Sequence, residues 1–321
     1  MEENRMKHLL SVVCLAAVAI VNEAQAFTIQ EDWLFSVAYI ANESTGKAGT
    51  GFFVMREVAQ GKGPLFLVLN KHVLEPKDSD PAATNKEAFA VMHITKEGAD
   101  GELVLEPIRI TLRNKEGAPL WIGHPVPDVD VAVLRITEYV AQGGELKPKY
   151  KVGYINESDF VTDDLTKTTH LSIGDPLVVL GYPLNIVEGR SSIPVARGGV
   201  IGTPPNRKFK GKDFFLIDCS TIRGSSGSPV FVPVRPYTVS YNEQKKITTI
   251  NPMETYFPKL LGVVSQTVSD WELVIRRTHT FGAPPDETSV IDTANFGLVY
   301  PARTISETLD KSGFSAYKPE K

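Results

Sequence analysis

Cysteine is scarce in this chain. Its 321 residues include only Cys14 and Cys219, and Cys14 lies in an N-terminal segment that we expect to be removed. The one remaining cysteine excludes an intramolecular disulfide, so the apolar core alone must hold the folded chain together. Residues 27–321 are numerous enough to bury such a core.

The chain also lacks a block of basic residues. Its 34 lysines and arginines are balanced by 38 aspartates and glutamates, which gives a formal net charge of −4. Binding to nucleic acid usually requires a basic face. The sequence therefore predicts no nucleic-acid partner, and its ordinary shares of apolar and charged residues indicate a globular protein.

The one extended apolar run is too short to span a bilayer comfortably. It extends from Leu9 to Val21, whereas a membrane-spanning helix needs about 20 apolar residues. Ala24 and Ala26 follow it in the A-x-A arrangement of a cleavage site. This pattern is typical of a secretory signal peptide, residues 1–26; the alternative is a buried N-terminal helix. We expect an exported protein, periplasmic or secreted, with no membrane span in its mature part.

From residue 27 onward the sequence is a series of short apolar runs separated by Gly, Pro, Asn and Asp. Their length and their content of β-branched and aromatic residues are typical of strands. Helical periodicity occurs near the end, in residues 303–312, where Ile305 and Leu309 are one helical turn apart. The pattern predicts an all-β protein, a sandwich or barrels, with one short C-terminal helix.

Two polar stretches interrupt the strand pattern. Residues 141–169 combine mixed charges and turn-forming residues with few apolar ones, and we interpret them as a linker between two halves of the fold. Residues 235–259 are predicted to form an exposed loop or hairpin. The sequence shows no internal repeat and no low-complexity tract.

Three stretches place reactive side chains next to apolar strands. The run LFLVL leads to His72, Asp130 opens the run VAVLRI, and Ser226 lies within GSSGSPVF. By composition alone, GSSGS is typical of a flexible linker. The strand-like segments FFLIDCS before it and PVFV after it indicate instead a rigid turn between buried strands.

These residue types suit nucleophilic catalysis. A serine hydroxyl is a weak nucleophile and needs a base within hydrogen-bond reach, and an imidazole, with an unperturbed pKa of about 6.5, is suitable. A carboxylate must then fix the tautomer of the imidazole and stabilise its charged form. Backbone amides must converge on the developing oxyanion, and glycines beside the serine permit the tight turn that aims them.

The three motifs resemble those of the chymotrypsin-like (trypsin-fold) serine peptidases, in that family's order of His, Asp and Ser. NKHV resembles the histidine motif, DVAVL the Asp-x-Ala-x-Leu strand, and GSSGSPVF the Gly-Asp/Asn-Ser-Gly-Gly/Ser-Pro motif. Weaker matches in the same order are GTGFFV, IGDPLVVLGYP, LLGVVS and FGLVYPA. The resemblance covers nearly all of the mature chain and is strongest to bacterial members without disulfides.

The resemblance implies two antiparallel six-stranded β-barrels with the active site in the cleft between them. Barrel one would occupy about residues 27–140, the linker 141–169, barrel two 170–302 and the C-terminal helix 303–312. The implied activity is that of an exported serine endopeptidase, acting on proteins or peptides through an acyl-enzyme, without cofactor or metal. The alternative is a catalytically latent or inactive protein of this fold that acts as a binding module.

The resemblance also assigns catalytic roles by motif. Ser226 would be the nucleophile, His72 the general base and acid, and Asp130 the carboxylate that orients His72. The backbone amides of Gly224 and Ser226 would form the oxyanion hole.

The substrate-binding residues implied by the resemblance are Ser220, Thr221 and Ser265. Ser220 would be the neutral floor of the specificity pocket, which argues against selection of Arg or Lys. Ser228 in place of a second glycine, and Thr221 before the motif, resemble the staphylococcal glutamyl-endopeptidase group. This sequence departs from that group on the substrate-pairing strand, where Val264 and Ser265 stand in place of a histidine.

Other residues compete with these assignments. Asp128 and Asp130 share one face of a strand, and the family's spacing between aspartate and alanine selects Asp130. His124 is near them in sequence but lies in a loop-like stretch, so it is not assigned as the base. No close spacing of His, Cys or acidic residues predicts a zinc site, and Cys219 is expected to be a small apolar core residue.

Overall fold

The structure is a computed structural model of the chain. The predicted signal peptide, residues 1–26, lies outside the residues that it describes. Those residues are 31–75, 87–98, 101–142, 145–147, 149–168, 171–185, 193–222, 224–233, 237–242, 247–252, 258–267 and 296–317.

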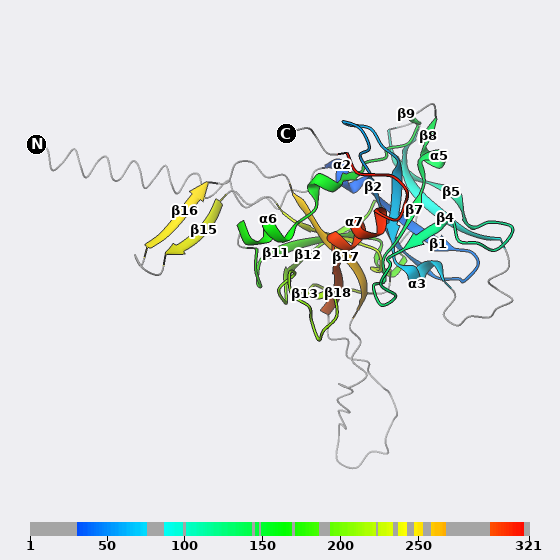
Figure 1. Cartoon of the computed structure of the whole chain (residues 1–321). Coiled ribbons are helices and arrows are strands. Elements are labelled where there is room, and N and C mark those ends of the chain that lie inside the picture. Colours follow the sequence, from blue (N-terminus) through cyan, green and yellow to red (C-terminus); the bar gives the residue numbers. More distant parts are fainter. Residues whose placement is uncertain are drawn as a thin grey trace, which may run out of the picture.

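The N-terminal half of the chain forms one β-sheet of eight strands (Figure 1), with the order β5-β4-β1-β2-β3-β7-β6 and with β10 added to β2. All its pairs are antiparallel except β10–β2. The strands are β1 (Val37–Asn42), β2 (Ala48–Met55), β3 (Leu65–Leu69), β4 (Ala88–Glu97), β5 (Leu103–Arg113), β6 (Trp121–Gly123), β7 (Ala132–Arg135) and β10 (Ile155–Asn156).

This sheet is a half-barrel, consistent with the predicted double-barrel fold, and it carries two strands more than the predicted six. The additional strands β6 and β10 have three and two residues, too few to show an alternating pattern in the sequence. Arg113, the last residue of β5, forms an isolated bridge with Pro119, which lies two residues before β6. Next to it, the backbone N–H of Leu120 donates to the carbonyl of Leu112 at 2.9 Å. The sheet therefore curls into a partial barrel.

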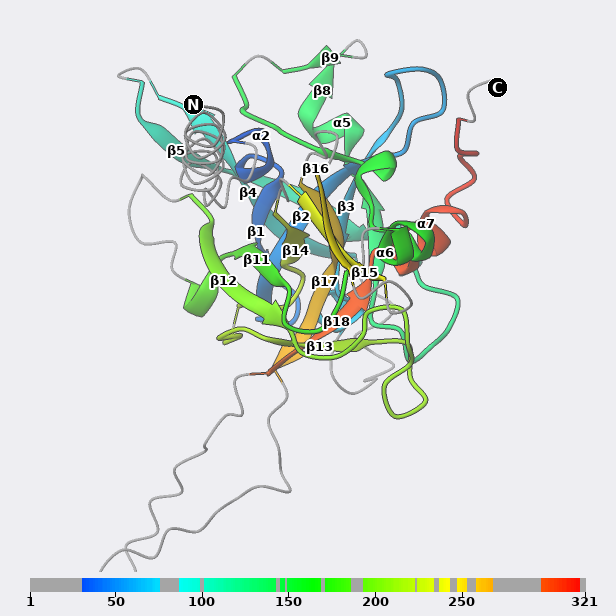
Figure 2. The ribbon, with the colours of Figure 1, turned by 90° about the vertical axis from the view of Figure 1, so that its left-hand side faces the viewer.

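The C-terminal half forms a closed antiparallel barrel of six strands, in agreement with the prediction, with the order β11-β12-β13-β18-β17-β14. In Figure 2 this barrel lies nearer the viewer, with β1, β2 and β3 behind it. Its strands are β11 (Pro176–Gly181), β12 (Val195–Ile201), β13 (Phe215–Asp218), β14 (Pro229–Val232), β17 (Lys259–Thr267) and β18 (Phe296–Pro301), and the C-terminal helix α7 (Arg303–Leu309) follows the last strand.

The polar insertion at 235–259 contains a hairpin, one of the two forms that the sequence predicted. Its strands β15 (Tyr237–Asn242) and β16 (Ile247–Pro252) pair with each other and extend away from the barrels in Figure 1. Among the helices that the structure describes, none is long and apolar enough to cross a membrane. The remaining elements are α2 (Glu31–Leu34), α3 (Lys71–Leu74), α5 (Thr137–Val140), α6 (Asp163–Thr168), β8 (Ala141–Gln142), β9 (Glu145–Leu146) and the 3₁₀ turns η1 (Glu157–Asp159) and η2 (Pro183–Asn185).

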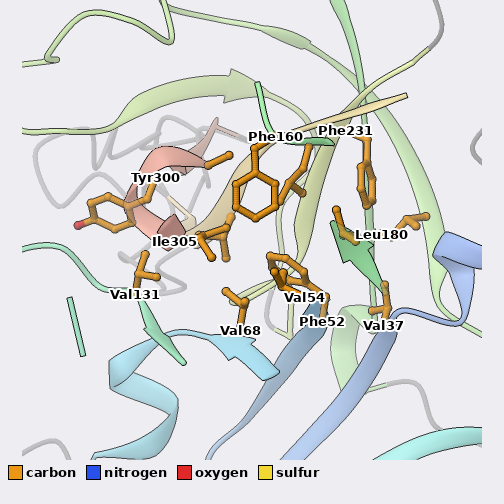
Figure 3. Close-up of a cluster of buried hydrophobic side chains, with 14 of the residues drawn as sticks. Val37, Phe52, Val54, Val68, Val131, Phe160, Leu180, Phe231, Tyr300 and Ile305 are labelled. Atoms are coloured by element: carbon orange, nitrogen blue, oxygen red, sulfur yellow. The ribbon is translucent and has the colours of Figure 1, made fainter. Parts of the chain in front are cut away.

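Side chains from both halves meet in one buried hydrophobic cluster (Figure 3). Phe52 and Val68 come from the N-terminal sheet, Phe231 from the closed barrel and Ile305 from α7. All four are fully buried, and burial of such a side chain contributes about 1.5–3 kcal/mol. The shared cluster fixes the two halves against each other, so residues of both halves can form one site.

A buried arginine ties three segments of the chain together. The side chain of Arg56, directly after β2, is only 3% exposed. Its Nη1 donates to both carboxylate oxygens of Glu157, each at 2.8 Å, its Nη2 donates to Asp310, and its Nε donates to the carbonyl of Phe314 at 3.1 Å. Burial alone lowers the pKa of Arg56, but Asp310 and Glu157 outweigh burial and raise this pKa overall.

Replacing Arg56 with methionine is expected to lower the free energy of unfolding by about 3 kcal/mol, because Glu157 then loses its cation in a largely buried place. Urea denaturation followed by tryptophan fluorescence measures this loss. Arg135→Met is the matched control, since that side chain is half exposed and lies 3.4 Å from Glu138. An exposed pair of this kind contributes less than about 1 kcal/mol. Equal unfolding midpoints for the two variants would contradict the prediction.

Candidate active site

His72 lies in the single turn of α3, directly after β3. The fully buried Asn70 precedes this turn, and its side-chain amide donates to the carbonyl of Asp130 at 2.7 Å. Nζ of Lys47 donates to the carbonyl of His72 at 2.8 Å. The imidazole itself is 43% exposed. The backbone of His72 is therefore held on two sides while its ring stays open to solvent.

Asp130 holds His72 at two points. Nδ1 of the imidazole lies 2.6 Å from Oδ2 of Asp130, and the backbone N–H of His72 donates to Oδ1 at 3.0 Å. The hydroxyl of Ser265 also donates to Oδ2, at 2.6 Å. An ionised carboxylate in this position keeps the proton of the imidazole on Nδ1. Nε2 is then free to accept a proton from a nucleophile.

Ser226 lies in a tight turn directly before β14, held by strands of both halves. The carbonyl of Ser226 accepts the N–H of Thr50 at 2.8 Å, and the carbonyl of Gly224 accepts the hydroxyl of Thr50 at 2.9 Å. On the other side, the N–H of Gly227 donates to the carbonyl of Val264 at 2.7 Å. The GSSGS segment is therefore a fixed turn and not a flexible linker.

The turn of Ser226 lies beside the segment that carries His72. A methyl group placed on Gly49 would lie 3.0 Å from the carbonyl oxygen of Ser226 and 3.1 Å from the side chain of Val73. Within the described part of the chain, no hydrogen bond joins Oγ of Ser226 to Nε2 of His72. The structure thus links Asp130 to His72 directly, and it places the backbone of Ser226 and the side chain of Val73, the residue after His72, against the same glycine. In unliganded enzymes such catalytic bonds are often long and shorten when substrate binds.

Two backbone amides of the turn find no acceptor among the described residues. Gly224 adopts a φ of 90°, which glycine tolerates without a steric penalty. The amides of Ser225 and Gly227 are bonded, whereas those of Gly224 and Ser226 donate to no acceptor among the described residues. Neighbouring free donors in a rigid turn are what an oxyanion hole requires.

The three predicted substrate-binding residues lie in different surroundings. Ser220 is exposed, and its carbonyl accepts a hydrogen bond from Arg197. Thr221 is buried. Ser265 is also buried, and its hydroxyl donates to Asp130. Neither the bond from Ser265 nor the contact from Arg197 was anticipated from the sequence, because no local motif signals them.

The two competing residues lie elsewhere. The carboxylate of Asp128 is exposed and 3.7 Å from Nζ of Lys212. His124 is buried, with Nε2 at 2.7 Å from a carboxylate oxygen of Glu307 in α7. In the contacts of the described residues, neither side chain reaches His72.

Comparisons with known proteins agree with this architecture. A family model described as a trypsin-like peptidase domain matches residues 49–233, a range that includes His72, Asp130 and Ser226. No protein with a curated description matches the chain.

Two similar solved structures are Rv3671c from M. tuberculosis H37Rv, in an inactive form with one serine changed to alanine, and Deg5. The chain is 18% identical to the first, with a TM-score of 0.39 and coverage of 90% of this chain and 91% of that chain. It is 16% identical to the second, with a TM-score of 0.40 and coverage of 74% and 82%.

Proposed function

Because this chain belongs to the family of trypsin-like peptidase domains, we propose that it is a serine endopeptidase that cleaves proteins or peptides through an acyl-enzyme on Ser226. The observation that carries the proposal is the pairing of Asp130 with His72, in which Oδ2 and Nδ1 are 2.6 Å apart. Beside this pair, a rigid turn presents a serine hydroxyl and two amides without acceptors. Together these groups are the requirements of acyl transfer to serine.

In the proposed reaction, Oγ of Ser226 attacks the carbonyl carbon of the scissile peptide bond while Nε2 of His72 takes the hydroxyl proton. The carbonyl electrons move to oxygen, and the amides of Gly224 and Ser226 donate to the oxyanion. His72 then gives its proton to the departing amine as the C–N bond breaks. A water deprotonated by His72 then attacks the carbonyl carbon of the resulting ester, the C–O bond to Ser226 breaks, and His72 returns the proton to Oγ of Ser226. Asp130 stays ionised throughout.

Export of the enzyme to the periplasm or the extracellular space is part of the proposal and rests on the sequence of residues 1–26. The neutral Ser220 supports a preference for substrates without a basic side chain before the cleaved bond. The glutamyl-endopeptidase-like character of GSSGSP stays a prediction.

A fluorophosphonate probe tests the proposed function, because it reacts with an activated serine hydroxyl and not with an ordinary one. The labelled protein is digested, and the modified residue is located by mass spectrometry. We expect one adduct on Ser226 and none on Ser225 or Ser228. The rate at which the protein cleaves an unfolded substrate protein should fall in proportion to the fraction of Ser226 that is labelled. Ser226→Ala serves as the blank for both measurements.

The outcome that would contradict the proposal is a wild-type protein that is not labelled and cleaves no member of a broad peptide library. It would favour the second candidate, a binding module on the same fold. The observation that favours a binding module is that, within the described residues, no hydrogen bond joins Ser226 to His72.

A further inference from the structure

Arg197 contacts the segment that leads to Ser226. It lies on β12, opposite Val179 of β11. Its Nη1 donates to the carbonyl of Ser220, and its Nη2 donates to the hydroxyl of Ser225 at 2.8 Å. In the part of the chain that the structure describes, this guanidinium forms no ion pair with a carboxylate. The guanidinium of Arg197 therefore binds both Ser220 and Ser225 through neutral oxygens.

The surroundings of Arg197 are unfavourable for a charge. Burial lowers the pKa of its guanidinium, and the nearby Cys219 offsets only part of this effect. Its Nε is buried and finds no hydrogen-bond partner among the described residues. Arginine nevertheless stays protonated in proteins. An apolar residue often stabilises such a place as well or better, so stability alone does not explain why an arginine is present.

Ser225 connects Arg197 to the turn that carries Ser226. It is only 1% exposed, and its hydroxyl also accepts the N–H of Ile222 at 3.1 Å. Its own N–H donates to the carbonyl of Ile222 at 2.9 Å, and its carbonyl accepts the N–H of Ser228 at 3.0 Å. Ser225 lies between Gly224 and Ser226 in the chain, so its position fixes both amides without acceptors.

We propose that Arg197 is a positioning residue that holds Ser220 and Ser225, and with them the amides of Gly224 and Ser226, in the geometry that binds the oxyanion. This inference rests on the proposed function. The cation comes from a strand of the same barrel, so the intact chain makes the contact.

Steady-state kinetics of Arg197→Met test this role. We expect kcat to fall about 100-fold, the loss that follows from misplacing a reacting group by about 1 Å, while KM for peptides changes little. Labelling of Ser226 by the fluorophosphonate should slow by a similar factor, because the phosphonyl oxygen uses the same amides. Arg197→Lys keeps the charge but loses the bidentate donor geometry of the guanidinium. Its kcat should lie between those of Arg197→Met and the wild type.

Arg207→Met is the matched control, because it removes the same charge from an exposed position in the same half of the chain. It is expected to keep the wild-type kcat and labelling rate. Thermal denaturation shows whether Arg197→Met is folded at the assay temperature. If it is not, Ser225→Ala replaces it, since this variant removes the receiving hydroxyl and should lower kcat in the same way. In a double variant the two losses should not add, because both act on one contact.

A folded Arg197→Met protein with an unchanged kcat would overturn the inference. So would a rise in KM confined to substrates with acidic side chains, because Arg197 would then read the substrate instead of holding the turn. A wild-type protein that the probe does not label would overturn the proposed function itself, and this inference with it. Labelled wild type beside an impaired Arg197→Met and an unimpaired Arg207→Met supports both.

Discussion

Changing Asp130 to asparagine is expected to lower kcat about 10,000-fold with little change in stability. In the wild type, Oδ2 of Asp130 faces Nδ1 of His72 at 2.6 Å, and Oδ1 accepts the backbone N–H of His72. In the variant, the amide oxygen keeps the backbone bond and the NH₂ group turns toward Nδ1. The imidazole must then accept at Nδ1 and carry its proton on Nε2. It can no longer take a proton from Ser226.

Asp128→Asn is the matched control for this prediction. It removes the same charge two residues earlier, from a side chain that is 75% exposed. We expect its kcat to stay within about twofold of the wild type, as is usual for surface substitutions. Both variants are measured with one peptide substrate at one pH. A strongly lowered kcat in Asp128→Asn beside a wild-type kcat in Asp130→Asn would show that the family spacing selects the wrong carboxylate.

Changing Gly227 to alanine is expected to abolish labelling of Ser226 and to lower the thermal midpoint by roughly 10 °C. The φ of Gly227 is +84°, and an added Cβ would lie 1.8 Å from the carbonyl oxygen of Thr50 and 2.9 Å from its carbonyl carbon. Backbone atoms cannot move aside as the end of a flexible side chain can. Either β2 or the turn must shift, and both of the contacts of Thr50 with the turn are then lost.

Gly211→Ala is the control that separates the steric clash of an added Cβ from the backbone strain of a positive φ. Gly211 has a φ of +78°, but a Cβ there would meet no atom within 4 Å. The control therefore adds only the cost of a left-handed conformation, about 1–2 kcal/mol, and should be labelled at the wild-type rate. Differential scanning calorimetry and probe labelling of the two variants give the comparison. Wild-type labelling of Gly227→Ala would contradict the close approach to Thr50.

Much of the fold is predictable because long apolar runs form its main strands. The runs PLVVLG and FGLVYP become β11 and β18 of the closed barrel, and the periodic segment after Pro301 becomes α7. The partial barrel could not be predicted in detail. Its strand β10 is a two-residue parallel pairing with β2, and so short a contact depends on tertiary packing and not on local pattern.

The candidate site is also predictable in part from the sequence. The resemblance to the peptidase family implied the roles of Asp130 and His72, and the structure places Oδ2 of Asp130 2.6 Å from Nδ1 of His72. The bond from Ser265 to Asp130 was not predictable, because it joins residues far apart in the chain through the packing of two halves. The same holds for Arg197 and Ser225, whose contact depends on the register of β12 in the barrel.

The cluster that joins the two halves also sets the order in which the molecule can mature. Phe52 and Val68 of the first-synthesised sheet pack in the same cluster as Ile305, which lies close to the C-terminus. A growing chain therefore exposes part of its core until the last helix has emerged from the ribosome. His72 and Asp130 are made early, but the turn of Ser226 is held by both Thr50 and Val264, so it can be fixed only after β17 has been made. We therefore expect the proposed active site to assemble only near the end of synthesis.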